Sequence, residues 1–144
     1  MVKMDKKILI VEARFYNQIA DALVEGAISL ITDAGYKYER IAVPGVFEIP
    51  AAIGCIWNAG AHAGCISLGC VIRGETDHYE HICREVSRKL MDQSVDYLMP
   101  HGFGIITCEN EAQAWERADA DKRNFGGKAA EACLRIIELK PGVQ

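Results

Sequence analysis

The segment best suited to chemistry is 68–81, which reads Leu-Gly-Cys-Val-Ile-Arg-Gly-Glu-Thr-Asp-His-Tyr-Glu-His. Its apolar start predicts the end of a strand, and its polar second half predicts the start of a helix. The backbone amides of Glu75, Thr76 and Asp77 would then lie free at a helix N-terminus, which favours binding of a phosphate group. His78 follows one turn into this helix, where an imidazole can move protons near a bound anion at neutral pH. The alternative interpretation is an exposed histidine with no chemical role.

Metal and cofactor chemistry have less support in the same segment. His78 and His81 have the i, i+3 spacing of two metal ligands on one helix face, and Glu80 or Cys83 could complete such a site. The sequence shows no further cluster of ligands, and it lacks both a P-loop and a GxGxxG fingerprint for nucleotides. These observations favour neither a metal site nor a nucleotide cofactor.

Two further segments suit a ring-shaped, hydroxylated ligand. Phe15 follows the first apolar run, so its ring can stack on a flat ligand, unless it packs on a neighbouring helix instead. The segment 44–50 reads Pro-Gly-Val-Phe-Glu-Ile-Pro, in which proline and glycine predict a sharp turn before a helix. Its carboxylate, Glu48, can accept hydrogen bonds from hydroxyl groups, or it can simply favour the helix N-terminus electrostatically.

The elements that position these segments follow from the hydrophobic pattern. Four short runs rich in Ile, Val, Leu and Cys predict buried strands. These are 8–12, 38–43, 64–70 and 102–108. The stretches between and after them predict helices that begin near residues 19, 48, 77, 110 and 128. Gly35 is expected to end the first helix, Asn110 to cap the fourth, and the last to span 128–139.

Alternating strands and helices of this length predict an α/β fold in a single domain over residues 1–144. The expected architecture is a flavodoxin-like three-layer sandwich, in which helices cover both faces of a four-stranded parallel sheet. Ligands of such sheets bind at the carboxyl ends of the strands. Each of the three segments described above follows a predicted strand, so we expect them to meet at one edge of the sheet.

Composition narrows the partners and the compartment. The formal charge of −4 argues against a nucleic-acid partner, because binding to a phosphate backbone needs clustered Lys and Arg. Six cysteines are scattered without a CxxC pair, which is typical of proteins in a reducing compartment. No apolar stretch approaches the roughly 20 residues of a membrane span, and the polar start lacks a signal peptide. We expect a cytoplasmic protein with no membrane partner.

Four motifs together resemble the lumazine synthase family, in order and in spacing, over about residues 8–139. The motifs are Arg14-Phe15, Pro44-Gly45-Val46-Phe47-Glu48-Ile49-Pro50, Gly69-Cys70-Val71-Ile72-Arg73-Gly74-Glu75-Thr76-Asp77-His78 and Gln113-Ala114-Trp115-Glu116-Arg117-Ala118. The resemblance implies a transferase of riboflavin biosynthesis that makes 6,7-dimethyl-8-ribityllumazine. Its small-molecule substrates would be 5-amino-6-ribitylamino-uracil and 3,4-dihydroxy-2-butanone 4-phosphate, with loss of phosphate and water and without a cofactor.

The resemblance also implies a role for each motif. Phe15 would stack on the pyrimidine ring, and His78 would transfer protons. The remaining residues fall into groups that hold the ribityl chain (Val46, Phe47, Glu48), line the edge of the ring (Cys70, Val71, Ile72) and bind phosphate (Gly74, Glu75, Thr76). The neighbouring subunit would contribute a further group, with its two basic members directed at phosphate (Phe103, Arg117, Lys128).

The resemblance implies a homo-oligomer whose sites lie at subunit interfaces. We expect a pentamer rather than a larger shell, because the connection 119–127 is longer than in many relatives and few residues precede the first strand. The same length leaves Lys122 and Arg123 open as alternatives to Lys128. Two other functions also stay open: a non-catalytic paralogue that binds a lumazine or flavin, and a structural shell protein. His78, Arg117 and Glu48 favour catalysis over binding alone, and a shell protein would not require Glu48 together with the turn from Arg73 to His78.

Overall fold

The computed structural model describes residues 6–74 and 79–141. Its four strands form a parallel sheet in the order β2-β1-β3-β4. They are β1 (Lys7–Ala13), β2 (Tyr38–Val43), β3 (His62–Ile72) and β4 (His101–Cys108). All four predicted strands are confirmed, with β3 longer at both ends than expected. β3 is buried along its whole length, as a parallel strand covered on both faces must be.

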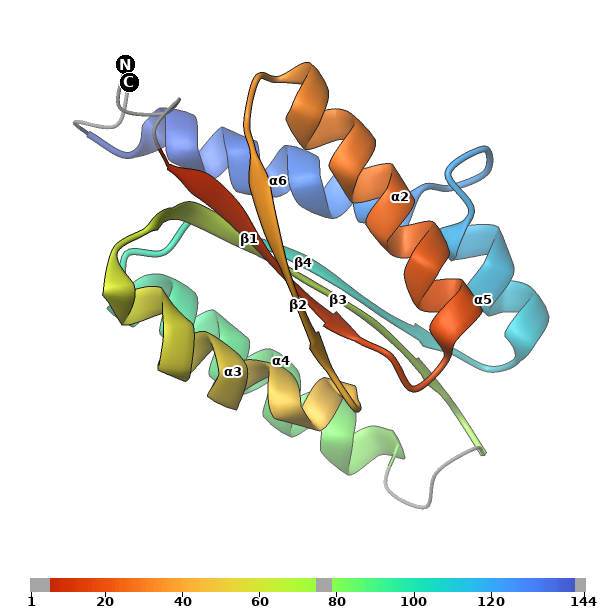
Figure 1. The fold of residues 1–144 in the computed structure, drawn as a ribbon. Coiled ribbons are helices and arrows are strands. Elements are labelled where there is room, and N and C mark those ends of the chain that lie inside the picture. The colour runs from red at the N-terminus through yellow and green to blue at the C-terminus, as the bar shows by residue number, and fades with distance from the viewer. Residues whose placement is uncertain (1–5, 75–78, 142–144) are drawn as a thin grey trace.

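Helices form one layer on each face of the sheet (Figure 1). One layer consists of α2 (Asn17–Asp33), α5 (Glu111–Ala118) and α6 (Phe125–Leu139), and the other of α3 (Ile49–Ile56) and α4 (Tyr79–Asp96). Short 3-10 turns flank α3, and these are η1 (Val46–Glu48) and η2 (Trp57–Ala59). This arrangement confirms the predicted three-layer, flavodoxin-like α/β fold. No helix within the described ranges is both long enough and apolar enough to cross a membrane.

The alternation of side chains along the strands divides the apolar interior into two cores. On β1, Ile8 and Ile10 belong to the core beneath α2, α5 and α6. Leu9 and Val11 belong to the core beneath α3 and α4. Because β1 contributes to both cores, it is held from both faces as well as by its two neighbouring strands.

The two C-terminal helices begin at asparagine caps. Asn110 accepts a hydrogen bond from the backbone amide of Gln113 at 2.9 Å, as the sequence predicted. The predicted start of the last helix at residue 128 was wrong, because α6 begins at Phe125 and Asn124 caps it through the amide of Gly127. Gly126 and Gly127 were expected in the connection 119–127. They lie in the first turn of α6, where this helix passes close to α2. The connection between α5 and α6 is therefore 119–124.

We predict that Gly126→Ala destabilises the fold although alanine is the better helix former. A Cβ atom at Gly126 would overlap the carbonyl oxygen of Leu23, so α6 would have to move away from α2. We expect the free energy of unfolding in urea to fall by about 1–3 kcal/mol. The control is Gly54→Ala in α3, where the nearest atom would lie 4.0 Å away and a gain of about 0.5–1 kcal/mol is expected. Equal effects of the two substitutions would contradict this view of the packing.

Candidate active site

A pocket of about 190 Å³ lies at the carboxyl ends of β1, β2 and β3. Its walls come from the loops after the first two strands, from the last residues of β3 and from α4. The lining residues are Phe15, Tyr16, Gly45, Val46, Phe47, Cys70, Val71, Ile72 and Ile82. The structure thus brings together, in one pocket, predicted site residues from three separate segments of the sequence. This is the edge of the sheet where a ligand was expected.

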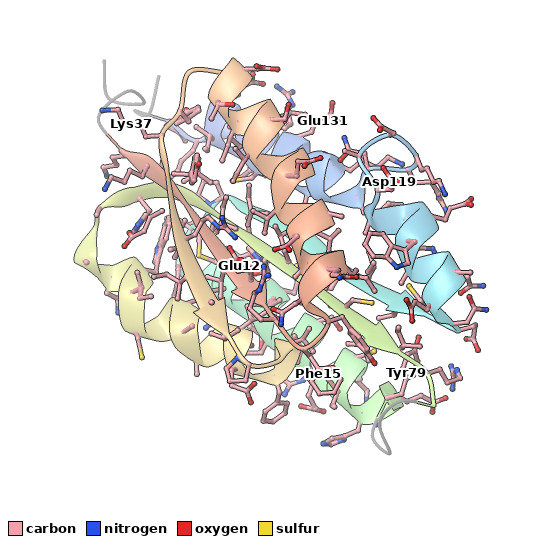
Figure 2. The ribbon with its side chains drawn as sticks, turned by 45° about the vertical axis from the view of Figure 1, so that its right-hand side comes forward. Glu12, Phe15, Lys37, Tyr79, Asp119 and Glu131 are labelled. Atoms are coloured by element: carbon pink, nitrogen blue, oxygen red, sulfur yellow. The ribbon has the colours of Figure 1, made fainter. Side chains whose placement is uncertain are left out.

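Two aromatic rings at the rim of the pocket remain open to solvent. Phe15 is 64% exposed and Phe47 is 58% exposed, so neither ring is packed into a core. Phe15 makes an edge-on contact with Tyr16, with ring centroids 4.9 Å apart. Figure 2 shows Phe15 beside the start of α2, at the same end of the sheet as Tyr79. Large apolar rings exposed beside a pocket are suited to stacking on a planar ligand.

The thiol of Cys70 lines the pocket as an apolar group. Burial, chiefly, and the neighbouring Cys108 together raise the pKa of Cys70 to about 12. Below that pH the sulfur is a protonated thiol, which is a poor nucleophile. Cys70 therefore forms part of the wall together with Val71 and Ile72, and the contact of these residues with a ligand ring stays a prediction.

Glu48 holds the turn that precedes α3. Its Oε1 accepts a hydrogen bond from the backbone amide of Gly45 at 2.9 Å. This contact supports the alternative interpretation of Glu48 as a local, helix-starting residue. Glu48 is not among the residues that line the pocket. Its role toward hydroxyl groups of a ligand stays a prediction.

The predicted phosphate segment is only partly described. Gly74 has a φ of +86°, which confirms a turn directly after β3. Glu75, Thr76 and His78 lie outside the described residues. His78 is also one of the two histidines of the alternative metal site, so that site is only partly described as well. Arg73 pairs with Glu80 at 3.2 Å and with Glu109 at 3.1 Å, and its guanidinium lies 4.4 Å from the centre of the Tyr79 ring.

Phe103, Arg117 and Lys128 lie outside this pocket. Phe103 is on β4 and 48% exposed, beside α4 and α6. Arg117 donates to the carbonyl oxygen of Thr107 at 3.2 Å and lines a polar hollow of about 430 Å³ together with Arg123. Lys128 is not among the residues that line that hollow, and its Nζ lies 5.0 Å from the centre of the Phe125 ring. Of the alternatives that the sequence left open, Arg123 is the one that shares a hollow with Arg117.

Sequence reasoning missed three residues of the pocket: Tyr16, Gly45 and Ile82. Ile82 lies in α4, within the helix predicted to begin near residue 77, but no motif marked it as a pocket residue. Gly45 was recognised only as a turn residue. Tyr16 directly follows the predicted aromatic, so the pair of rings was the available signal.

The fold and the pocket define an α/β domain with an aromatic-rimmed ligand site at the carboxyl edge of its sheet. The sequence model of the 6,7-dimethyl-8-ribityllumazine synthase family matches residues 5–141. The chain is 52% identical over 143 residues to 6,7-dimethyl-8-ribityllumazine synthase of Bartonella tribocorum, covering 97% of this chain and 95% of that protein. It is 49% identical over 138 residues to the enzyme of the same name from Agrobacterium fabrum, covering 92% and 93%. The enzyme of this name from Nitrobacter hamburgensis is 49% identical over 137 residues, covering 92% and 84%. The chain belongs to the 6,7-dimethyl-8-ribityllumazine synthase family.

We predict that Cys70→Ala changes the turnover number of the enzyme by less than about threefold, because a neutral thiol contributes shape rather than nucleophilic attack. The raised pKa also predicts that no thiol ionisation is seen in the pH–rate profile between pH 6 and about 9. The measurement is steady-state kinetics on both proteins over that range. A loss of about 100-fold or more in turnover, with substrate affinity retained, would show that the sulfur takes part in the reaction.

Proposed function

We propose that this chain catalyses the formation of 6,7-dimethyl-8-ribityllumazine from 5-amino-6-ribitylamino-uracil and 3,4-dihydroxy-2-butanone 4-phosphate. The observation that carries the proposal is the pocket between Phe15 and Phe47, which joins the predicted ring-binding residues at the carboxyl edge of the sheet. In this role Phe15 stacks on the pyrimidine, while Cys70 and Val71 contact its edge. Val46, Phe47 and Glu48 hold the ribityl chain.

The chemistry asks the protein chiefly to position two reactants. An amine attacks a carbonyl group, water and phosphate leave, and the ring closes. Orienting two bound reactants contributes several kcal/mol to such a condensation. His78 is proposed to move protons during imine formation and elimination, which adds about 10²- to 10⁴-fold in rate. Gly74, Glu75 and Thr76 are proposed to bind the phosphate group.

The site is proposed to be shared between two subunits. None of the described residues that line the pocket carries a positive charge, although one substrate carries a phosphate. The cations must then come from elsewhere, and Arg117 with Lys128 or Arg123 is the proposed source, from the neighbouring subunit. A wall supplied by a neighbour would also exclude water from a pocket that opens at the edge of a sheet.

An exposed apolar hollow supports assembly of identical subunits. It has a volume of about 570 Å³ and is lined by Ser87, Leu90, Met91, Ser94, Val95, Met99, His101, Phe103 and Ile136. It lies beside β4, which is an edge strand of the sheet and so has unpaired backbone groups. Contiguous apolar surface of this kind marks protein–protein contacts. In a closed ring each subunit both gives and receives residues, and we propose a pentamer.

The state of the cysteines bears on the compartment. All six are free thiols in the structure, and four of them are buried. Free thiols persist where the surroundings are reducing. We therefore infer that the enzyme works in the cytoplasm.

We predict that the purified protein converts the two substrates to 6,7-dimethyl-8-ribityllumazine, followed by absorbance and fluorescence, without added metal or nucleotide. Phe15→Asp is the matched control and should be inactive, because a carboxylate replaces the stacking ring. Protein that binds the lumazine but never forms it would support the non-catalytic paralogue instead. Activity lost to a chelator and restored by zinc would revive the metal site at His78 and His81.

We predict that Phe15→Asp and Arg117→Ala, each inactive alone, recover activity when co-refolded in equal amounts. A site is complete when one subunit gives an intact Phe15 and its neighbour an intact Arg117. Random assembly makes about a quarter of the interfaces complete, so about a quarter of the wild-type activity should return.

The controls for this experiment concern assembly. Each parent refolded alone should stay inactive, and light scattering should give the mass of a pentamer for parents and mixture. If mixed rings form and yet remain inactive, Phe15 and Arg117 serve the same subunit's site and the shared site is wrong.

A further inference from the structure

Glu12 is the buried charged residue of β1, whose other charged residue, Lys7, is exposed. It lies on β1, and its side chain is only 3% exposed. By alternation it shares the face of Ile8 and Ile10, which is the face covered by α2. A carboxylate removed from water costs several kcal/mol unless charged partners and hydrogen bonds compensate it. The residues that bind the Glu12 carboxylate therefore indicate its role.

Two arginines share the Glu12 carboxylate. Arg40 on β2 binds it with two groups, Nε to Oε2 at 2.7 Å and Nη2 to Oε1 at 2.8 Å. Arg14, which follows the end of β1, donates from Nη1 to Oε1 at 2.7 Å. The hydrogen bond to Glu12 raises the pKa of Arg40. The carboxylate thus lies between an arginine of the edge strand and an arginine of the loop that leads to the pocket.

The rest of the Arg14 guanidinium holds that loop together. Its Nε donates to Oδ1 of Asn17 at 2.9 Å, and its Nη2 donates to the carbonyl oxygen of Asn17 at 3.2 Å and to Asp21 at 2.6 Å. The backbone amide of Arg14 donates to the carbonyl oxygen of Val43 at 2.9 Å. Arg14 therefore ties the loop after β1 to the start of α2 and to the end of β2. Phe15 lies between Arg14 and Asn17.

Phe15 needs such a support because its ring has little packing beyond the edge-on contact with Tyr16. Its ring is 64% exposed, so its place at the rim depends on the backbone that carries it. We infer that Glu12 is a positioning residue for the proposed aromatic ligand: it orients Arg14, and Arg14 fixes the loop that presents Phe15. Figure 2 labels the two residues that Arg14 connects, Glu12 near the middle of the sheet and Phe15 toward one end of it. The inference rests on the proposed stacking role of Phe15.

Arg40 provides the matched control. It binds the same carboxylate through more hydrogen bonds than Arg14 does, yet its side chain is 44% exposed on the edge strand and lies on β2 rather than in the Phe15 loop. If Glu12 served only the general stability of the fold, substitution of Arg40 would have at least as large an effect as substitution of Arg14. A role in positioning Phe15 passes through Arg14 alone.

The test measures the dissociation constant of 6,7-dimethyl-8-ribityllumazine by fluorescence titration of the assembled protein. We predict that Glu12→Gln and Arg14→Gln each weaken binding about tenfold, whereas Arg40→Gln changes it less than about twofold. In a Phe15→Ala background, Glu12→Gln and Arg14→Gln should have no further effect, because they act through the missing ring. In steady-state kinetics the KM for the pyrimidine substrate should rise while the KM for the phosphate substrate stays unchanged.

The outcomes separate this inference from the proposed function. If Phe15→Ala leaves lumazine binding intact, the proposed stacking role fails. If Phe15→Ala weakens binding but Arg14→Gln and Glu12→Gln do not, the stacking role stands and the positioning role of Glu12 is overturned. Equal losses in the presence and absence of Phe15, or an equal loss from Arg40→Gln, would show a general structural effect instead. Arg14→Gln keeps the pair of Glu12 with Arg40, so the test does not depend on how well Glu12→Gln folds.

Discussion

The pocket depends on the pairing of β1 with a strand on each side. Ala13 is in register with Val43 of β2, and Glu12 is in register with Leu68 of β3, so β1 and β2 end together beside β3, which continues to Ile72. The amide of Arg14 extends this pairing beyond the strand by donating to Val43. A slip of one residue would turn every side chain of β1 to the other face and move its end by about 3.3 Å. The aromatic rim and the wall formed by β3 could then no longer meet.

The pocket is lined by apolar groups, whereas the charged residues described around it lie mostly outside its walls. The pocket itself is apolar, and its thiol is neutral because burial raises the pKa of Cys70 to about 12. Among the described charged residues, Glu12 and Arg14 lie behind it, Glu48 holds the turn at its rim, and Arg117 and Arg123 line another hollow. Such an apolar pocket suits the binding of a flat, uncharged ring. An ionic second substrate requires a second set of residues, which is why the proposed site extends across a subunit boundary.

Much of the fold was predictable, because a buried parallel sheet has a strong hydrophobic pattern. The meeting of the loops after β1 and β2 was also predictable, because the carboxyl ends of parallel strands lie at the same edge of a sheet. The start of α6 was not, because the requirement for glycine at 126 comes from the approach of Leu23 in another helix. The pairing of Glu12 was missed too, because its partner Arg40 lies on a different strand and no local pattern joins them. His78 lies outside the described residues, and its role is still an expectation from the sequence.

The central claim is that the pocket at the end of β1 is one half of a site completed by another copy of the chain. The most direct test is a cryo-electron microscopy or crystal structure of the assembled protein with bound 6,7-dimethyl-8-ribityllumazine. The account predicts the ligand ring stacked on Phe15 and against Val71, with Arg117 of a neighbouring subunit facing the same site. A ring bound away from Phe15, or one enclosed by residues of a single chain, would contradict it.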